Sequence, residues 1–362
     1  MPIDYAAAGV DTAAGDRAVE LMRAAVTATH PAAVLDGAGG FAGLYDASAL
    51  LGMRRPLLAT STDGVGTKIR IAQAMGIHDT IGQDLVAMVV DDLVVCGATP
   101  LFMTDYIACG RVVPERIADI VRGIATACAA TGTALIGGET AEHPGVMEPD
   151  DYDVAGAATG VVDADELRGP ARVVDGDVVV ALASSGLHSN GYSLVRRLVE
   201  VAGWSLDRHV PEFGRTLGEE LLEPTRLYTR LCLDLLPDVH AYAHVTGGGL
   251  AANLARVLPA GTLAVVDRGT ITPPPVFRVM RDLAGARWED LEGTLNLGVG
   301  MLALVADDAV ARVTAAAQDA GVAAWPIGRV QAGAAALAGA QVVTGTKGIS
   351  GGSVRLEGRY RD

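Results

Sequence analysis

The stretch Asp177-Val-Val-Val-Ala-Leu-Ala-Ser-Ser-Gly-Leu-His-Ser-Asn-Gly-Tyr192 contains the pattern that indicates the fold class. Its first seven residues form a run of strand length. A loop rich in glycine and serine follows, and then a helix-length segment from Tyr192 to Ala202. Runs of strand length alternate with amphipathic segments along the rest of the chain. The sequence therefore predicts an α/β (α+β) protein.

The other predicted elements follow the same criteria. Further strands are expected at 56–60, 100–107, 134–136, 153–162, 262–266 and 300–305, and further helices at 84–96, 114–131, 250–258 and 307–320. The helix from Pro114 has proline at its first position and Gly132 just beyond its end, which are typical start and stop signals.

A charged stretch with glycine and proline, Leu167 to Arg172, separates two series of strands and helices. We expect an N-terminal domain over residues 1–170 and a C-terminal domain over 171–332. Residues 333–362 are rich first in alanine and then in glycine, serine and threonine, and they are expected to form a weakly ordered tail.

Composition limits the class of partner. The 362 residues carry a net charge of −15, so the surface would repel a nucleic-acid backbone or an anionic membrane. Half of the residues are hydrophobic, which is ample for a buried core, whereas aromatic residues make up only 4%. The prediction is a protein that binds neither nucleic acid nor membrane, and that handles small anions through local loops.

The four cysteines show no CxxC pair and no spacing typical of zinc ligands, which indicates reduced, buried thiols. The segment Met1 to Tyr5 carries an early acid and no apolar leader, and no uninterrupted apolar stretch is long enough to span a membrane. A cytoplasmic location is expected.

The first candidate ligand-binding motif is Thr60-Ser-Thr-Asp-Gly-Val-Gly-Thr-Lys68. Glycines after a strand allow close approach of a phosphate, and Asp63 can offer oxygen to Mg²⁺. The spacing is not that of a P-loop. Taken alone, the motif fits a tight Asp-Gly hairpin turn better.

Two further segments add carboxylates. Asp91 and Asp92 end an apolar helical run, and because adjacent residues point about 100° apart on a helix, at least one must lie beside the buried face. Glu139 and Thr140 follow the strand at 134–136 after two glycines. Oxygen ligands without paired histidine or cysteine favour Mg²⁺. A pair of solvated acids is the alternative for Asp91 and Asp92, and His143 fits an ordinary loop residue.

Two loops that precede helices are typical of anion sites. The first contains His188, Ser189 and Asn190, with His188 placed to act as a general acid or base. The second is the glycine triplet Gly247, Gly248 and Gly249. Helix capping alone is the alternative for the first loop, and a flexible loop is the alternative for the second. A glycine-rich segment at 37–43 fits a flap over a nucleotide or an ordinary linker.

With these motifs in order, the chain resembles the phosphoribosylformylglycinamidine cyclo-ligases, also called aminoimidazole ribonucleotide synthetases. The resemblance extends from Tyr5 to about Gly328. It is carried by residues 5–11, 39–41, 62–68, 78–82, 84–88, 137–142, 151–156, 184–194, 223–226, 246–249 and 296–301. It departs from the family at Asp91, where asparagine is usual.

The resemblance implies an N-terminal domain that binds ATP and dimerises through the strands of a mixed or antiparallel sheet, followed by a C-terminal α/β domain. ATP would phosphorylate the formyl oxygen of formylglycinamidine ribonucleotide, and an amidine nitrogen would then attack and close the imidazole ring. The products would be aminoimidazole ribonucleotide, ADP and phosphate. Mg²⁺ is implied, and a monovalent cation is a further candidate.

The implied residue roles form three sets. Metal and ATP ligands are Asp63, Asp92 and Glu139, with Asp91 as a fourth metal ligand; ATP contacts are Gly39, Gly40, Phe41, Gly64 and Lys68; substrate contacts are Thr140, Ser189, Asn190, Gly247, Gly248 and Gly249. His188, Lys68 and Asp63 are the expected catalytic residues.

Two other classes compete with this interpretation. Sister ATP-dependent enzymes, such as thiamine monophosphate kinase or selenophosphate synthetase, share the two-domain plan. Selenophosphate synthetase would need a reactive cysteine near the N-terminal loop, and the first cysteine is Cys96. A catalytically silent nucleotide-binding scaffold would need few of the motifs above.

Overall fold

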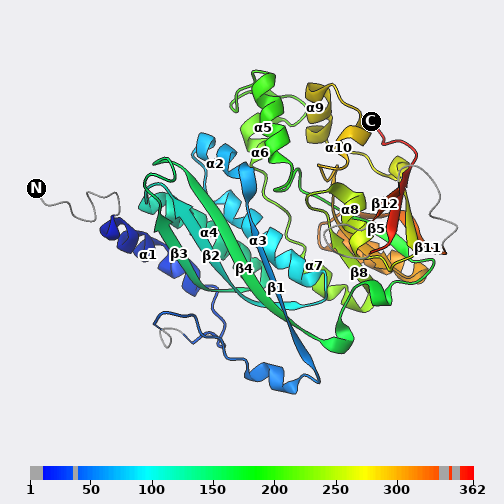
Figure 1. The fold of residues 1–362 in the computed structure, drawn as a ribbon, viewed down its shortest axis with the longest axis horizontal. Helices are drawn as coiled ribbons and strands as arrows, with labels where there is room; N and C mark the ends of the chain where they lie inside the picture. The colour runs from blue at the N-terminus through cyan, green and yellow to red at the C-terminus, as the bar shows by residue number, and fades with distance from the viewer. Residues whose placement is uncertain (1–10, 36–39, 334–341, 345–350) are drawn as a thin grey trace, which may run out of the picture. The chain divides into compact units, whose positions relative to one another are not determined.

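The computed structural model describes residues 11–35, 40–333, 342–344 and 351–362 (Figure 1). The chain forms two compact units. The first comprises Met1–Val94 with Ala98–Glu166, and the second comprises Val95–Gly97 with Leu167–Asp362. The units therefore divide between Glu166 and Leu167, at the start of the stretch where the sequence changes character.

The first unit contains a four-stranded sheet in the order β1-β4-β2-β3. Its strands are β1 (Pro56–Gly64), β2 (Thr99–Cys109), β3 (Ala134–Glu142) and β4 (Tyr152–Asp163), and its helices are α1 (Thr12–Thr27), α2 (Ile69–Met75), α3 (Thr80–Val94) and α4 (Pro114–Thr131). Both β1 and β2 run antiparallel to β4, and β3 runs parallel to β2, so the predicted mixed sheet is confirmed.

One face of this sheet is covered and the other is open within the chain. Alternate residues of β4, from Tyr152 to Gly160, are buried, and α3 packs against β1, β2 and β4. On the other face, Leu58 of β1 and Tyr106 of β2 are 68% and 43% exposed. α4 packs beside α3 and begins and ends where the sequence predicts, with Gly132 in the left-handed conformation after it.

The second unit contains a seven-stranded sheet in the order β12-β13-β9-β11-β5-β10-β8. Its strands are β5 (Val178–Ala183), β8 (Val239–His244), β9 (Thr262–Asp267), β10 (Val299–Val305), β11 (Ala324–Ala332), β12 (Val342–Thr344) and β13 (Ser353–Glu357). Its helices are α5 (Tyr192–Val201), α6 (Leu217–Leu221), α7 (Thr229–Asp234), α8 (Gly249–Arg256), α9 (Pro275–Ala284), α10 (Trp288–Leu291) and α11 (Val310–Asp319), and a small ribbon pairs β6 (His209–Val210) with β7 (Arg215–Thr216). The sheet is antiparallel except for the pair β9 and β13.

The core of the second unit lies around β5 and β10, in which nearly every residue is buried, as continuous apolar runs predict. The expectation of a weakly ordered tail is wrong for two segments of residues 333–362. β12 and β13 are both strands of the seven-stranded sheet. In Ser353-Val-Arg-Leu-Glu357, polar residues alternate with the apolar Val354 and Leu356. This period-two pattern is typical of a strand and was the missed signal.

Candidate active site

Asp63 lies at the end of β1, opposite Gly156 of β4, and its side chain is exposed. Its Oδ1 accepts a hydrogen bond of 2.8 Å from the backbone N–H of Gly64. The chain then continues through a 3₁₀ turn at Gly66–Lys68 into α2, so β1 pairs with the distant β4. The alternative of a hairpin turn is therefore wrong, and Asp63 is presented at a strand end as the ligand hypothesis requires.

Lys68 lies in the core, where it is fully buried against α3. Its Nζ is 2.8 Å from both carboxylate oxygens of Asp84, which is also fully buried. A phosphate could reach Lys68 only if the buried ammonium group became accessible. In this structure Lys68 therefore ties the segment after Asp63 to α3, and a direct catalytic role has no geometric support.

The acids of α3 differ in exposure. Asp91 is completely buried and Asp92 is partly exposed, which confirms that at least one of them lies beside the buried face. Asp92 is thus the better placed of the two for contact with a solvent-borne ligand.

Glu139 lies in β3, paired with Tyr106 of β2, whereas Asp63 shares a row with Asp105 across the sheet. Three strand spacings separate β1 from β3, roughly 14 Å. Adjacent rows also point to opposite faces. The structure therefore does not bring Asp63 and Glu139 together within one chain, and their shared metal role stays a prediction. Among the residues that the structure describes, no three His, Cys, Asp or Glu side chains gather into a metal site.

Asp105 is an acid that the sequence reasoning missed. It is 9% exposed on β2, and its carboxylate packs so closely against Gly138 that a Cβ there would lie 2.4 Å from Oδ1. It lines a cavity of about 430 Å³ together with Glu139, Thr140 and the apolar side of α1. Burial raises the pKa of Asp105 to about 7. A lone acid inside the apolar run Pro100 to Ile107 was the available signal.

The raised pKa gives a prediction for stability against pH. Protonated Asp105 stabilises the fold fully below the unfolded pKa of about 4, and this contribution, up to about 4 kcal/mol, is lost as pH rises through 7. We expect Asp105→Asn to be more stable than the wild type at pH 8. The free energy of unfolding of the wild type should fall between pH 4 and 7, and this fall should be much smaller in the variant. Urea unfolding followed by far-UV circular dichroism at several pH values measures this. An unchanged pH profile would contradict it.

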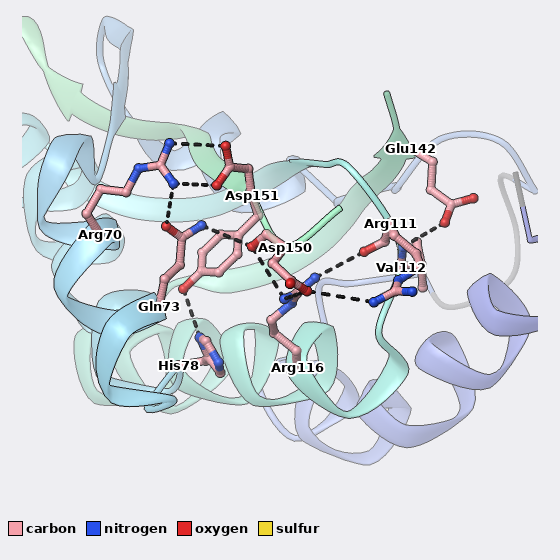
Figure 2. A network of polar contacts seen from close by, with 10 residues as sticks. Arg70, Gln73, His78, Arg111, Val112, Arg116, Glu142, Asp150 and Asp151 are labelled. Carbon is pink, nitrogen blue, oxygen red and sulfur yellow. Dashed lines mark hydrogen bonds and ion pairs between the residues drawn. The ribbon is translucent and has the colours of Figure 1, made fainter. Parts of the chain in front are cut away.

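A network of ion pairs and hydrogen bonds anchors the segment between β3 and β4 (Figure 2). Arg70 of α2 makes a two-pronged contact with Asp151. The carbonyl of Asp150 accepts from Gln73 at 3.2 Å and from Arg116 at 3.4 Å. The loop before this anchor, Pro144–Pro149, lines a second cavity of about 360 Å³ with exposed Val146. The three connections hold this end of the sheet in place.

Glu142 fixes the other side of the same segment. Its Oε1 accepts from the backbone N–H of Val112 at 2.6 Å, and its Oε2 accepts from that of Asp11 at 2.7 Å. His143 contacts Tyr106, with Nε2 3.3 Å from the hydroxyl, which agrees with a loop histidine. Gly40 and Phe41 are exposed, whereas Gly39 lies outside the described residues.

In the second unit, the loop after β5 is built around His188. The imidazole is 1% exposed, the residue has φ of +62°, and Nε2 accepts from the backbone N–H of Ser185 at 3.1 Å. Nε2 is therefore the unprotonated nitrogen of a neutral ring. The ring packs against Tyr228, and Gly300 leaves the space for both. His188 shapes the loop, and its predicted catalytic role would require the ring to become exposed.

The loop and the glycine triplet meet. A Cβ on Gly247 would lie 3.7 Å from the side-chain oxygen of Asn190. Gly248 and Gly249 have φ of +103° and +71°, and α8 begins directly at Gly249. Buried Asn253 donates to the carbonyls of Thr246 and Gly249, which holds the turn. The two glycine-rich segments predicted from the sequence therefore lie side by side at the start of α8, where the N–H of Gly249 donates to the carbonyl of Thr246 at 3.1 Å. A helix start suits an anion, and a shared anion site stays a prediction.

Comparison with known proteins defines the class first. A model described as "AIR synthase related protein, N-terminal domain" matches residues 45–162, and one described as "AIR synthase related protein, C-terminal domain" matches residues 174–337. The chain thus has both domains of an AIR synthase related protein.

The chain belongs to the phosphoribosylformylglycinamidine cyclo-ligase family. It is 47% identical over 332 residues to the enzyme of that name from Geobacillus sp. (strain WCH70), covering 91% of this chain and 96% of the relative. The enzyme of the same name from Alkaliphilus oremlandii is 45% identical over 337 residues, covering 92% and 98%. The resemblance expected from the motifs is confirmed.

Solved structures share the fold at lower identity. Thiamine-monophosphate kinase from Stenotrophomonas maltophilia has a TM-score of 0.67 at 21% identity, covering 95% of this chain and 97% of that one. The hydrogenase maturation protein HypE in complex with ATP has a TM-score of 0.58 at 18% identity, covering 88% and 86%. These likenesses support the fold class.

Proposed function

We propose that this protein catalyses the ATP-dependent cyclisation of formylglycinamidine ribonucleotide to 5-aminoimidazole ribonucleotide in purine biosynthesis. The observation that carries the proposal is the identity of 45–47% to cyclo-ligases over 96–98% of their length. No observation favours a sister ATP-dependent enzyme at comparable strength, since thiamine-monophosphate kinase is similar at only 21% identity.

ATP would convert the formyl oxygen into a phosphate ester, which turns a poor leaving group into a good one. The amidine nitrogen then forms the ring bond to the former formyl carbon, phosphate leaves with the oxygen, and ADP is the other product. The charge of the transferring phosphoryl group needs cations and oriented N–H groups around it.

We assign the substrate's ribose phosphate to the second unit. Asn190 lies beside Gly247 of the glycine triplet, Ser189 is its neighbour in the chain, and the start of α8 at Gly249 suits a phosphate monoester. The buried ring of His188 holds this loop through its hydrogen bond with the N–H of Ser185. Thr140 lines the cavity beside Asp105 in the first unit, so its assignment as a substrate contact has less support than the others.

We assign ATP to the first unit, with Asp63, Gly64 and Asp92 as its contacts there. Magnesium bound to ATP is held by phosphate oxygens and water and needs only one or two protein carboxylates. A cluster of three is thus not required, and exposed Asp63 suits this role. Asp91 is buried and Glu139 lies three strand spacings from Asp63, so we leave both out of this set.

We propose a homodimer that buries the open face of the four-stranded sheet, including Leu58 and Tyr106. In the described part of the chain no helix is long and apolar enough to cross a membrane. We place the enzyme in the cytoplasm, where the free thiols of its four cysteines would stay reduced.

The proposed function is tested with purified protein, ATP, Mg²⁺ and formylglycinamidine ribonucleotide. We expect ADP and aminoimidazole ribonucleotide in equal amounts, and no ADP release without the ribonucleotide. Absence of substrate-dependent product would overturn the proposal. ADP formation with thiamine monophosphate in its place would identify the sister activity.

Asp63→Ala tests the ATP assignment. Loss of one charge-assisted contact is expected to lower kcat/KM for ATP about 10- to 100-fold, because such bonds contribute about 1.5–3 kcal/mol. The matched control is Asp119→Ala, which removes an exposed acid of α4 that pairs only with neighbouring Arg122 in the described contacts. Full activity of Asp63→Ala would show that Asp63 does not contact ATP.

A further inference from the structure

The segment Ser353–Asp362 lies beyond the matched C-terminal domain model, which ends at residue 337. It is nevertheless built into the second unit. β13 runs parallel to β9, with Ser353 opposite Leu263 and Glu357 opposite Asp267. The backbone N–H of Arg361 then donates to the carbonyl of Ile271 at 3.1 Å. The segment is thus fixed along its length.

The first contact of interest joins this part of the chain to α8. A Cβ on Gly351 would lie 2.1 Å from the carbonyl oxygen of Ala255, near the end of α8. The N–H of Gly352 donates to the carbonyl of Leu258 at 2.9 Å. β12 and β13 both pack against α8, the helix that begins at Gly249. The C-terminal strands therefore support the helix that carries the glycine triplet.

The second contact runs through Glu292. The hydroxyl of Tyr360 donates to Glu292 Oε2 at 2.8 Å. Arg268 donates to both carboxylate oxygens at 2.7 and 2.8 Å, and its third nitrogen donates to the carbonyl of Leu356 at 2.7 Å. Tyr360 and Arg268 are 9% and 6% exposed. Burial raises the pKa of Tyr360, so its hydroxyl stays a donor.

Glu292 in turn lies directly against the glycine triplet. A Cβ on Gly249 would lie 1.8 Å from the carbonyl oxygen of Glu292 and 3.2 Å from Cα of Gly293. Glu292 therefore contacts Gly249 through its backbone while Tyr360 and Arg268 hold its side chain. Asp362 holds the preceding helix as well, because its carboxylate accepts from the indole N–H of Trp288 at 3.1 Å.

We propose that Ser353–Asp362 is a positioning element for the Gly247–Gly249 loop, acting through Tyr360, Arg268 and Glu292. The segment holds Glu292 against Gly249 from one side and α8 from the other. Its role is to hold the loop and the start of α8 in the conformation that receives the phosphate of the substrate, and it touches no reacting atom. The inference rests on the proposed function, because the phosphate is that of formylglycinamidine ribonucleotide.

The test compares Tyr360→Phe, which removes only the hydroxyl, with Tyr152→Phe. Tyr152 is also buried and its hydroxyl lies 2.9 Å from His78, but it belongs to the first unit. For Tyr360→Phe we expect KM for formylglycinamidine ribonucleotide to rise about three- to tenfold, the scale of one buried hydrogen bond, with kcat nearly unchanged. Tyr152→Phe should leave this KM unchanged.

Hydrogen exchange of peptides covering 246–256 gives a readout that does not depend on activity. Exchange in the first turn of α8 should be faster in Tyr360→Phe than in the wild type and unchanged in Tyr152→Phe. If the wild type makes no product, the proposed function fails, whereas faster exchange still supports the structural coupling. If the wild type is active, and Tyr360→Phe keeps both the wild-type KM and the wild-type exchange, the positioning role is overturned.

Discussion

Asp84→Ala is expected to lower the free energy of unfolding of the first unit by about 3–5 kcal/mol, the usual cost of removing one partner of a buried ion pair. Lys68 Nζ lies 2.8 Å from the Asp84 carboxylate, and both side chains are completely buried. The variant leaves the ammonium group in the core without the counter-charge opposite it. Urea unfolding followed by far-UV circular dichroism measures the loss.

The controls for this variant come from the same chain. All three tryptophans, Trp204, Trp288 and Trp325, lie in the second unit, so the unfolding transition seen by Trp fluorescence should change little. Asp119→Ala removes an exposed partner of Arg122 and is expected to cost less than about 1 kcal/mol. The double variant Lys68→Met/Asp84→Leu should recover much of the loss, because both charges are then absent. A loss below about 1 kcal/mol for Asp84→Ala would contradict the argument.

The contrast between Lys68 and Asp63 shows what sequence alone can predict about this site. Both belong to one motif, and the motif correctly indicated the family. The motif could not predict the directions of the Asp63 and Lys68 side chains, because these depend on how the turn after β1 packs against α3. Asp84 also lies 16 positions after Lys68. Apolar flanks predicted that at least one of Asp91 and Asp92 lies beside the buried face, but no local pattern tells which acid Lys68 meets.

Sheet register explains why Asp63 and Glu139 of the predicted metal set lie apart in this chain. Asp63 and Glu139 each follow or end a strand, and the sequence suggested that the two ends meet. The strand order β1-β4-β2-β3 separates them by two strands, and the alternation of side chains sends them to opposite faces. Strand order depends on long-range pairing, so it could not be derived from spacing. The same pairing brought Asp105 to the cavity.

The loops of the second unit were predicted more completely because their chemistry is local. Glycines at positive φ before a helix serve the same purpose wherever the helix packs, and Asn190 and Gly247 do lie together. The sequence position of His188 is that of a general base, whereas its ring is buried in this structure. Its left-handed backbone and burial follow from packing against Tyr228 and Gly300, which lie far away in the sequence.

Gly249→Ala is expected to lower kcat/KM for formylglycinamidine ribonucleotide at least about 100-fold, because a displacement of about 1 Å in a substrate-positioning loop has a cost of that order. The new Cβ would lie 1.8 Å from the carbonyl oxygen of Glu292, so either the loop or the backbone of Glu292 must move. Glu292 is held by Arg268 and Tyr360, and the loop is therefore the part that shifts. Initial-rate kinetics at varied ribonucleotide concentration measure the effect.

Gly261→Ala separates this clash from backbone strain. Gly261 has φ of +80°, close to the +71° of Gly249, but a Cβ there meets no atom within 4 Å. Both variants place alanine in the left-handed region at a cost of about 1–2 kcal/mol in stability, and only Gly249→Ala adds the collision beside the phosphate site. Near-normal activity of Gly261→Ala with a large loss in Gly249→Ala assigns the loss to the loop. Equal activity of the two variants would show that Gly249 does not position the substrate, and the phosphate would then have to bind elsewhere in the second unit.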